Sequence, residues 1–189
     1  MMVFDDAYLS GLSPEDERII IDIARCAILN KFRLPCSEPQ INSKLKVRKG
    51  VFVTVNNGSE LRGCIGYPMP VLPLHIAIKN AAIQAAFADP RFEPLRSSEI
   101  NKINLEVTIL GDMKEISYYD INTIIIGRHG IYIESGIYSG ILLPQVAVEY
   151  NMTPIEFLRQ TCIKAGIEPE CYRRPDTRIY IYEGKIIRE

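Results

Sequence analysis

The chain has 189 residues, of which 47% are hydrophobic, and it carries a net charge of -1 with a pI of about 6.2. This composition is sufficient for one domain, or two apposed lobes, with a sizeable buried core. A net charge so close to zero excludes the global positive field that attracts nucleic acid or anionic membranes. Nucleic acid stays open as a partner only through local basic clusters, at residues 44–49 and at Arg173, Arg174 and Arg178.

Cysteine usage and the N-terminal segment both bear on location. The chain has five cysteines and no CxxC pair, which favours a reducing compartment over a disulfide framework. Pairing of Cys162 with Cys171 stays open. The N-terminus lacks the pattern of a secretory signal, and no apolar run approaches the roughly 20 residues that span a bilayer. We therefore expect a cytoplasmic protein without a membrane partner.

Two helices are predicted in the first half of the chain. Ser13 is a typical N-cap, Pro14 suits the first helical position, and acidic residues fill the first turn, so a helix is expected from there to about Leu34. Cys26 lies within it and is interpreted as structural. Small residues at helical spacing predict a second, more deeply buried helix over residues 73–88.

A hairpin between these helices carries the most informative segment. Residues 51–55 predict a strand, residues 56–59 a turn, and Glu60 to Tyr67 a returning strand. Side chains alternate along a strand, so Arg62 and Cys64 are expected on one face, with Gly66 leaving open space beside them. A guanidinium beside a thiol stabilises the nucleophilic thiolate. The alternative is that Cys64 is a small core residue and the glycines serve close packing.

The remainder of the chain predicts strands at residues 104–110, 121–126, 131–134 and 140–143, a capped helix at residues 153–166, and a closing strand at residues 178–182 with a turn at residues 183–184. Helices and strands alternate without a regular βαβ rhythm. The expected class is therefore α+β with mostly antiparallel pairing. We expect a single domain over residues 1–189, formed by two tightly apposed lobes of about 1–115 and 116–189 with a crevice between them.

A set of motifs follows in order along nearly the whole chain: residues 61–66 (Leu-Arg-Gly-Cys-Ile-Gly), 89–94 (Asp-Pro-Arg-Phe-Glu-Pro), 105–110, 127–131, 142–146 and 149–150. This set resembles the family named for the Alport syndrome, midface hypoplasia and elliptocytosis chromosomal region, the AMMECR domain family, in its prokaryotic and archaeal form. The chain departs from the family pattern in lacking a tryptophan near Met152. The resemblance implies an internally duplicated architecture and no established activity.

Two function classes follow. The first is an enzyme, or an enzyme subunit, that acts on a small-molecule or nucleic-acid-derived substrate in a cleft around residues 61–66. In it Cys64 is the nucleophile, Arg62 holds the thiolate or an anionic substrate, and His129 is the proton carrier. His75 is a less favoured carrier because it lies near a helix start. The second class is a non-catalytic module that binds a protein, peptide or nucleic acid. Candidate binding residues in either class are Gly63, Gly66, Asp89, Arg91, Glu106 and Glu134.

Asp89 and Arg91 also have an architectural interpretation, in which they fix the loop after the second helix and Phe92 anchors its packing. No zinc or phosphate-loop motif is present in the sequence, so neither a metal site nor a nucleotide cofactor is expected.

Overall fold

The computed structural model describes residues 5–189, which divide into two compact units. The first unit comprises residues 8–110 and 185–189, and the second comprises residues 5–7 and 111–184. The class is α+β with antiparallel pairing, as predicted. One strand, β7 (Thr177–Arg188), contributes its first part to the second unit and its last residues to the first.

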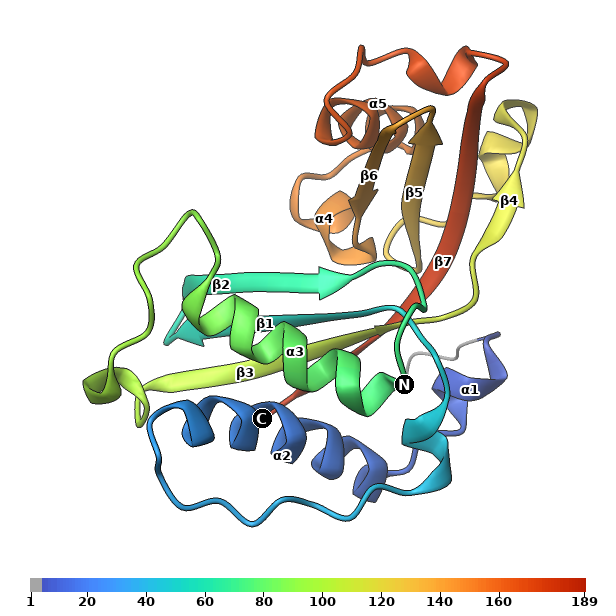
Figure 1. The fold of residues 1–189 in the computed structure, drawn as a ribbon. Helices are drawn as coiled ribbons and strands as arrows, with labels where there is room; N and C mark the ends of the chain where they lie inside the picture. The colour runs from blue at the N-terminus through green and yellow to red at the C-terminus, as the bar shows by residue number, and fades with distance from the viewer. Residues whose placement is uncertain (1–4) are drawn as a thin grey trace. The chain divides into compact units, whose positions relative to one another are not determined.

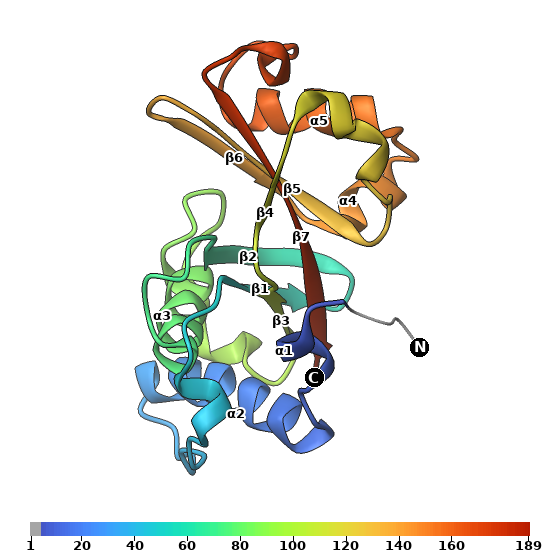
Figure 2. The same ribbon diagram turned by 90° about the vertical axis from the view of Figure 1, so that its right-hand side faces the viewer.

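The first unit is a three-stranded antiparallel sheet, extended by the end of β7, with two helices on one face (Figures 1 and 2). Buried aliphatic side chains of β1 and β3 face α2 and α3, as alternation along the strands requires. The core of this unit therefore lies between the sheet and the helices. Its elements are α1 (Ala7–Ser10), α2 (Pro14–Lys31), η1 (Ser43–Lys46), β1 (Val51–Asn57), β2 (Glu60–Tyr67), α3 (Leu74–Phe87), η2 (Ser97–Glu99) and β3 (Ile103–Leu110).

The predicted helices and hairpin of this unit are confirmed. Ser13 caps α2 in a reciprocal capping box with Asp16. The helix ends at Lys31, three residues earlier than expected. Arg33 has a φ of 57°, in the left-handed region, which is incompatible with a right-handed helix. The β1–β2 hairpin turns at Gly58, whose φ of 61° suits glycine.

The second unit packs α5 (Pro154–Lys164) against a sheet of β4 (Lys114–Ile116), β7, β5 (His129–Ser135) and β6 (Tyr138–Leu142). Thr153 forms the predicted capping box of α5. The core between sheet and helix contains Ile131, Ile133, Phe157 and the disulfide Cys162–Cys171. The remaining elements are η3 (Tyr118–Thr123), α4 (Pro144–Glu149) and η4 (Cys171–Arg173).

Two predictions in the second unit are wrong. Residues 121–126 do not form a strand: Ser117 caps a 3-10 helix, and Ile121 and Ile124, three residues apart, pack toward the core at the 3-10 period. Residues 183–184 do not form a turn. The buried Glu183 continues β7 because Arg128 pairs with its carboxylate at 2.6 Å.

The cysteines also differ from the expectation of a chain without a disulfide framework. Cys162 pairs with Cys171, and Cys26 in α2 pairs with Cys36, so Cys64 is the only free cysteine, all five lying within residues 5–189. Cys26 is structural, as interpreted, but through a covalent link. Within residues 5–189, no helix combines the length and apolar character that a membrane crossing requires.

Candidate ligand site on the sheet of the first unit

Strand β2 carries the Leu-Arg-Gly-Cys-Ile-Gly segment and has an irregular register with β1. Val55 lies opposite Gly63, but the next residue, Asn56, lies opposite Leu61, so Arg62 is an extra residue without a direct partner. This is a β-bulge, which turns a side chain away from regular alternation. The strict alternation that predicted Arg62 and Cys64 side by side on one face is therefore interrupted between them.

Gly63 faces the helix layer. A Cβ atom built on it would lie 1.9 Å from the carbonyl oxygen of Ala85, so α3 approaches β2 as closely as backbone allows. Gly66 is on the opposite face, where Phe52 is its partner in β1 and the Phe52 ring would lie 2.5 Å from a Cβ atom. The open space expected beside Gly66 is thus filled by this ring. Both glycines serve close packing.

The Arg62 side chain binds the segment between α3 and β3 and does not pair with the thiol of Cys64. Its Nε donates a 2.8 Å hydrogen bond to Glu99 Oε1, its Nη2 donates to Glu99 Oε2, and its Nη1 donates to the backbone carbonyl of Glu93 at 2.9 Å. This bidentate pair is half-buried and raises the pKa of Arg62 while lowering the pKa of Glu99. The expected placement of Arg62 against Cys64 is therefore replaced by an ion pair with Glu99.

Asp89 and Arg91 clasp the outer edge of β2. The Asp89 carboxylate is 4% exposed and accepts hydrogen bonds from the backbone N–H of Cys64 at 2.9 Å and from Arg91 Nη2 at 2.7 Å. The Arg91 side chain holds the pKa of Asp89 well below its usual range, with help from the backbone donors. Arg91 Nη2 also donates to the carbonyl of Cys64 at 3.4 Å, and its guanidinium stacks over Phe92. Both main-chain groups of Cys64 are thereby satisfied.

Cys64 places its partly buried thiol on the sheet face that α2 and α3 leave uncovered. The Thr54 hydroxyl, directly across the strand pair, donates to the sulfur at 3.3 Å. Burial raises the pKa of the Cys64 thiol, while the Thr54 hydrogen bond and the charge of Arg91 act in the opposite direction. The cation that acts on the pKa of Cys64 is Arg91 and not Arg62. Because this pKa is raised overall, the protonated thiol is the favoured form near neutral pH.

Glu106 completes a polar row on this face. It lies directly opposite Thr54 in the β1–β3 pair, so Cys64, Thr54 and Glu106 form a line across three strands. At one strand spacing per step, the line is roughly 10 Å long. The Glu106 carboxylate forms an ion pair with Arg188, with 2.9 Å between Glu106 Oε2 and Arg188 Nε, and the Arg188 side chain is 68% exposed. An exposed guanidinium therefore lies at each end of the row, Arg91 at one and Arg188 at the other.

His129 and Glu134 belong to the second unit. His129 begins β5, and its Nδ1 accepts a hydrogen bond from the backbone N–H of Ile125 at 3.1 Å, which places the proton of the neutral ring on Nε2. Burial and the nearby Arg128 lower the pKa of His129, so the ring is neutral at pH 7. Glu134 lies opposite Arg178 in the β5–β7 pair.

Three site residues were missed from the sequence: Thr54, Glu99 and Arg188. Thr54 could not have been placed from the turn alone, because regular pairing from Gly58 puts Thr54 opposite Gly63, and the bulge at Arg62 shifts it opposite Cys64. Glu99 and Arg188 also carry no local signal, since both reach the site from distant parts of the chain. Within residues 5–189, no three side chains of His, Cys, Asp or Glu are grouped as a metal ion would need.

The chain is similar to known proteins over nearly its whole length. A protein of Aquifex aeolicus is 40% identical over 181 residues, covering 92% of this chain and 93% of its own, and one of Methanothermobacter thermautotrophicus is 41% identical, covering 94% and 96%. The crystal structure of the uncharacterized protein PH0010 from Pyrococcus horikoshii superimposes with a TM-score of 0.84 at 38% identity, covering 93% of this chain and 92% of that one. The AMMECR1 family model matches residues 21–187, and the chain belongs to the AMMECR1 family.

Proposed function

We propose that this protein is a binding module, and that the row Cys64–Thr54–Glu106 with its two flanking arginines receives an extended peptide carrying carboxylate side chains. The observation that supports this most directly is the pair of exposed guanidinium groups. Arg91 and Arg188 are 52% and 68% exposed, and each is oriented by a carboxylate of the protein, Asp89 and Glu106. An arginine held in place loses less side-chain entropy when it binds an anion.

A peptide suits this arrangement better than a nucleic-acid backbone. The row between the two arginines contains the Glu106 carboxylate, which would repel a continuous line of phosphates. A peptide can place one carboxylate at each arginine and lay neutral main chain over the middle, where the Thr54 hydroxyl and the Cys64 thiol lie. The overall charge of -1 also gives no general attraction to polyanions.

The contacts of Cys64 argue against thiolate chemistry as the main role. An activated cysteine is stabilised by an adjacent cation, yet Arg62 is committed to Glu99, and burial raises the pKa of the Cys64 thiol. Two observations favour the enzyme alternative: the thiol is not fully buried, and the charge of Arg91 acts to lower its pKa. We further propose that the protein is cytoplasmic and has no membrane partner.

Binding can be tested with a panel of fluorescent probes titrated into the full chain: an acidic peptide, its glutamine-substituted counterpart and a single-stranded oligonucleotide. We expect saturable binding of the acidic peptide only, weakened about tenfold by Arg188→Gln, since a charge-assisted hydrogen bond contributes roughly 1.5 kcal/mol. Arg178→Gln is the matched control, because Arg178 is 57% exposed and also pairs with a glutamate, Glu115, in the second unit. Equal loss in both variants, or preference for the oligonucleotide, would contradict the proposal.

The enzyme alternative is separated by Cys64→Ser. A binding module keeps its affinity for the acidic peptide, because serine preserves the size and polarity of the side chain. An enzyme that uses the thiol as nucleophile loses turnover of its substrate while binding persists.

A further inference from the structure

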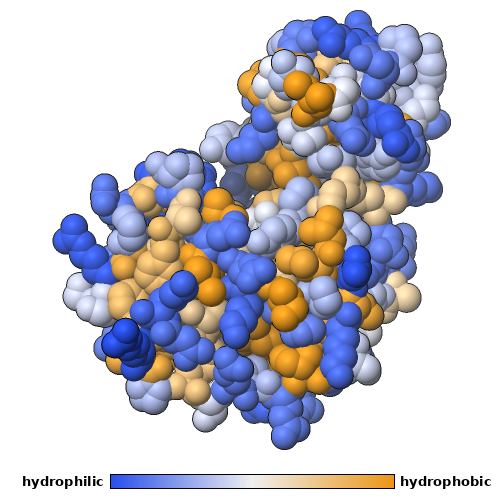
Figure 3. All heavy atoms as spheres, viewed as in Figure 1, coloured by the Kyte–Doolittle hydropathy of each residue, from blue (hydrophilic) through white to orange (hydrophobic). Residues whose placement is uncertain are grey.

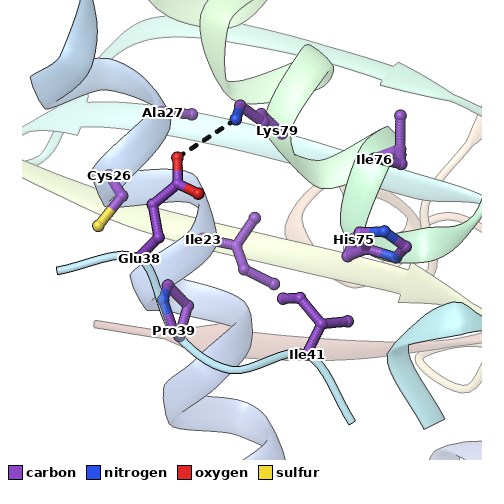
Figure 4. A pocket seen from close by; sticks show the side chains of 9 residues that line it. All are labelled: Ile23, Cys26, Ala27, Glu38, Pro39, Ile41, His75, Ile76 and Lys79. Carbon is purple, nitrogen blue, oxygen red and sulfur yellow. Dashed lines mark hydrogen bonds and ion pairs between the residues drawn. The ribbon is translucent and has the colours of Figure 1, made fainter. Parts of the chain in front are cut away.

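A cavity of about 200 Å³ lies in the first unit, away from the residues of the sheet site (Figure 4). Its walls come from α2, from the start of α3 and from the segment of residues 32–42 that joins α2 to η1, which we call the strap. Figure 3, viewed as in Figure 1, shows apolar patches among hydrophilic residues on the visible face of the first unit. The cavity walls are themselves mostly apolar, with Ile23, Ala27, Pro39, Ile41 and Ile76 among the lining residues.

The strap is fastened at both ends, so the cavity has a fixed wall. Near its start, Cys36 forms a disulfide with Cys26 of α2. At its end, Asn42 Nδ2 donates a 2.7 Å hydrogen bond to Asp16 Oδ1, and Asp16 is 3% exposed within the capping box of α2. Pro39 restricts the backbone between these points, and Pro35 restricts it immediately before Cys36. A wall that is already ordered reduces the conformational entropy that the protein loses when a ligand binds.

Charged groups of both signs meet at one side of the cavity. Glu38 Oε1, on the strap, lies 3.4 Å from Lys79 Nζ on α3, and Figure 4 shows the two side chains reaching toward one another. Asn30 Nδ2 donates to the same carboxylate oxygen at 3.4 Å. The opposite wall includes His75, whose Nδ1 lies 2.8 Å from the carbonyl of Leu45 and fixes the ring. The cavity thus has one zwitterionic side and otherwise apolar walls.

We propose that this cavity binds a free apolar α-amino acid, with the ligand ammonium on Glu38, the ligand carboxylate on Lys79 and the ligand side chain between Ile23 and Ile41. The size agrees, since a cavity of roughly 150 Å³ accommodates benzene, and a nucleotide would need a pocket of at least about 300 Å³. The charges agree as well. A loose ion pair at 3.4 Å is opened by a zwitterion that offers each partner a shorter contact of opposite charge.

The disulfide gives the site a dependence on redox state. Reduction by a dithiol would transfer two electrons and two protons to the Cys26–Cys36 bond, giving two thiols and the oxidised, disulfide form of the reductant. The strap would then lose its covalent link to α2 and keep only the Asn42 hydrogen bond and the 3.4 Å contacts of Glu38 among those described above, so Glu38, Pro39 and Ile41 would be held less firmly. The amino acid should consequently bind more weakly to the reduced protein.

Calorimetric titration of the oxidised full chain with L-leucine tests the site, with a dissociation constant on the order of 1 mM expected for a ligand of this size. Two analogues test each end of the ligand: leucinamide lacks the carboxylate, and 4-methylpentanoate lacks the ammonium. Both should bind at least about tenfold more weakly, since each loses one charge-assisted contact. Equal binding of leucine and either analogue would overturn the assignment of that end.

Variants locate the binding. Glu38→Gln and Lys79→Gln should each weaken leucine binding about tenfold on the same grounds. Glu168→Gln is the matched control, because Glu168 also forms an exposed ion pair, with Arg174 in the second unit. Cys36→Ser should weaken leucine binding to the level of the dithiol-reduced protein. Thermal melts of each variant show whether it is folded.

Methyl NMR of the wild-type protein gives a readout that does not depend on any variant folding. Leucine should shift the methyl resonances of Ala27 and Ile41 and leave those of Ile133, in the core of the second unit, unchanged. Absence of saturable binding by leucine, isoleucine, methionine and phenylalanine in both titration and NMR would overturn the proposal, as would binding that all variants and the reduced protein retain.

Discussion

The backbone N–H of Cys64 donates a 2.9 Å hydrogen bond to the carboxylate of Asp89, so a loop residue takes the place of a neighbouring strand at the edge of β2. Edge strands expose unpaired main-chain groups that invite pairing with other chains. Arg91 completes the cover by donating to the carbonyl of the same residue. The segment containing Asp89 and Arg91 is thus a structural partner of the cysteine segment, 25 residues apart in sequence.

Replacing Asp89 with asparagine should destabilise the protein by about 2–3 kcal/mol, because a buried carboxylate that receives several hydrogen bonds is lost and Arg91 is left without its ion-pair partner. Urea unfolding at pH 7 measures the effect. Asp176→Asn, at an exposed position, is the control and should change stability by less than about 0.5 kcal/mol. Equal stability of the two variants would show that the contacts of Asp89 with Arg91 and Cys64 contribute nothing to the free energy of unfolding.

The same variant predicts a pH dependence. The pKa of Asp89 is lowered in the folded state, chiefly by Arg91, so the unfolded chain takes up the proton first as the pH falls. The stabilisation is complete above the unfolded pKa of about 3.9 and is lost as the pH falls from there through the folded pKa. The stability gap between wild type and Asp89→Asn should therefore be constant from pH 7 to about pH 5 and shrink below about pH 4. A gap that stays constant to the most acidic measurable pH would contradict this.

Gly63→Ala should be among the most damaging single substitutions in the first unit. The added methyl group would lie 1.9 Å from the carbonyl oxygen of Ala85, and neither backbone can move without separating α3 from β2. Losing that packing should cost about 3 kcal/mol or more. Ser59→Ala in the exposed hairpin turn is the control. Thermal unfolding of both variants measures the effect, and a Gly63→Ala protein with wild-type stability would exclude the close approach of α3.

Much of the fold could be predicted because local signals agreed with it. Ser13 and Thr153 each open a helix with a reciprocal capping box, and Gly58 fixes the hairpin turn. Residues 121–126 misled because consecutive isoleucines satisfy strand and 3-10 patterns alike, and only packing onto the core decides between them. Burial of Glu183 depends on Arg128, 55 residues away, so β7 could not be extended from local sequence.

The site was less predictable for a similar reason. Cys64 and the Asp89–Arg91 pair were identified, but the bulge at Arg62 depends on pairing between β1 and β2 and has no signature in residues 60–67. Without the bulge, alternation favours an arginine beside the thiol, and the prediction of an activated cysteine follows. The ion pair with Glu99, 37 residues away, is what redirects Arg62. Local sequence predicted which residues matter, and long-range pairing determined what each of them contacts.

Cys64 should react slowly with iodoacetamide at pH 7 in the folded protein. Burial raises the pKa of its thiol, so the thiolate fraction is small at neutral pH, and the rate should rise steadily with pH beyond 9. Thr54→Val removes the hydrogen bond that lowers this pKa, so its Cys64 should react more slowly than that of the wild type at each pH. Mass spectrometry of the alkylated peptide gives both rates. Rapid modification at neutral pH would instead support the enzyme alternative.

The two disulfides should be reduced in a fixed order. They close loops of nearly equal length, with sequence separations of 10 for Cys26–Cys36 and 9 for Cys162–Cys171, so loop entropy does not distinguish them. Access does distinguish them. Cys36 is partly exposed, whereas Cys162 and Cys171 are fully buried in the core of the second unit. A thiolate must reach a sulfur atom along the disulfide axis, so dithiothreitol should open Cys26–Cys36 first and Cys162–Cys171 only after the second unit unfolds.

Timed alkylation and mass spectrometry of each cysteine under native conditions and in increasing urea measure this order. The Cys162–Cys171 rate should rise with urea in proportion to the unfolded fraction, while the Cys26–Cys36 rate should depend on urea only weakly. Replacing both Cys162 and Cys171 with alanine should lower stability by about 2–3 kcal/mol, the amount that cross-linking a loop of this length removes from the entropy of the unfolded chain. Simultaneous reduction of both bonds without urea would show that the core of the second unit opens in the native state.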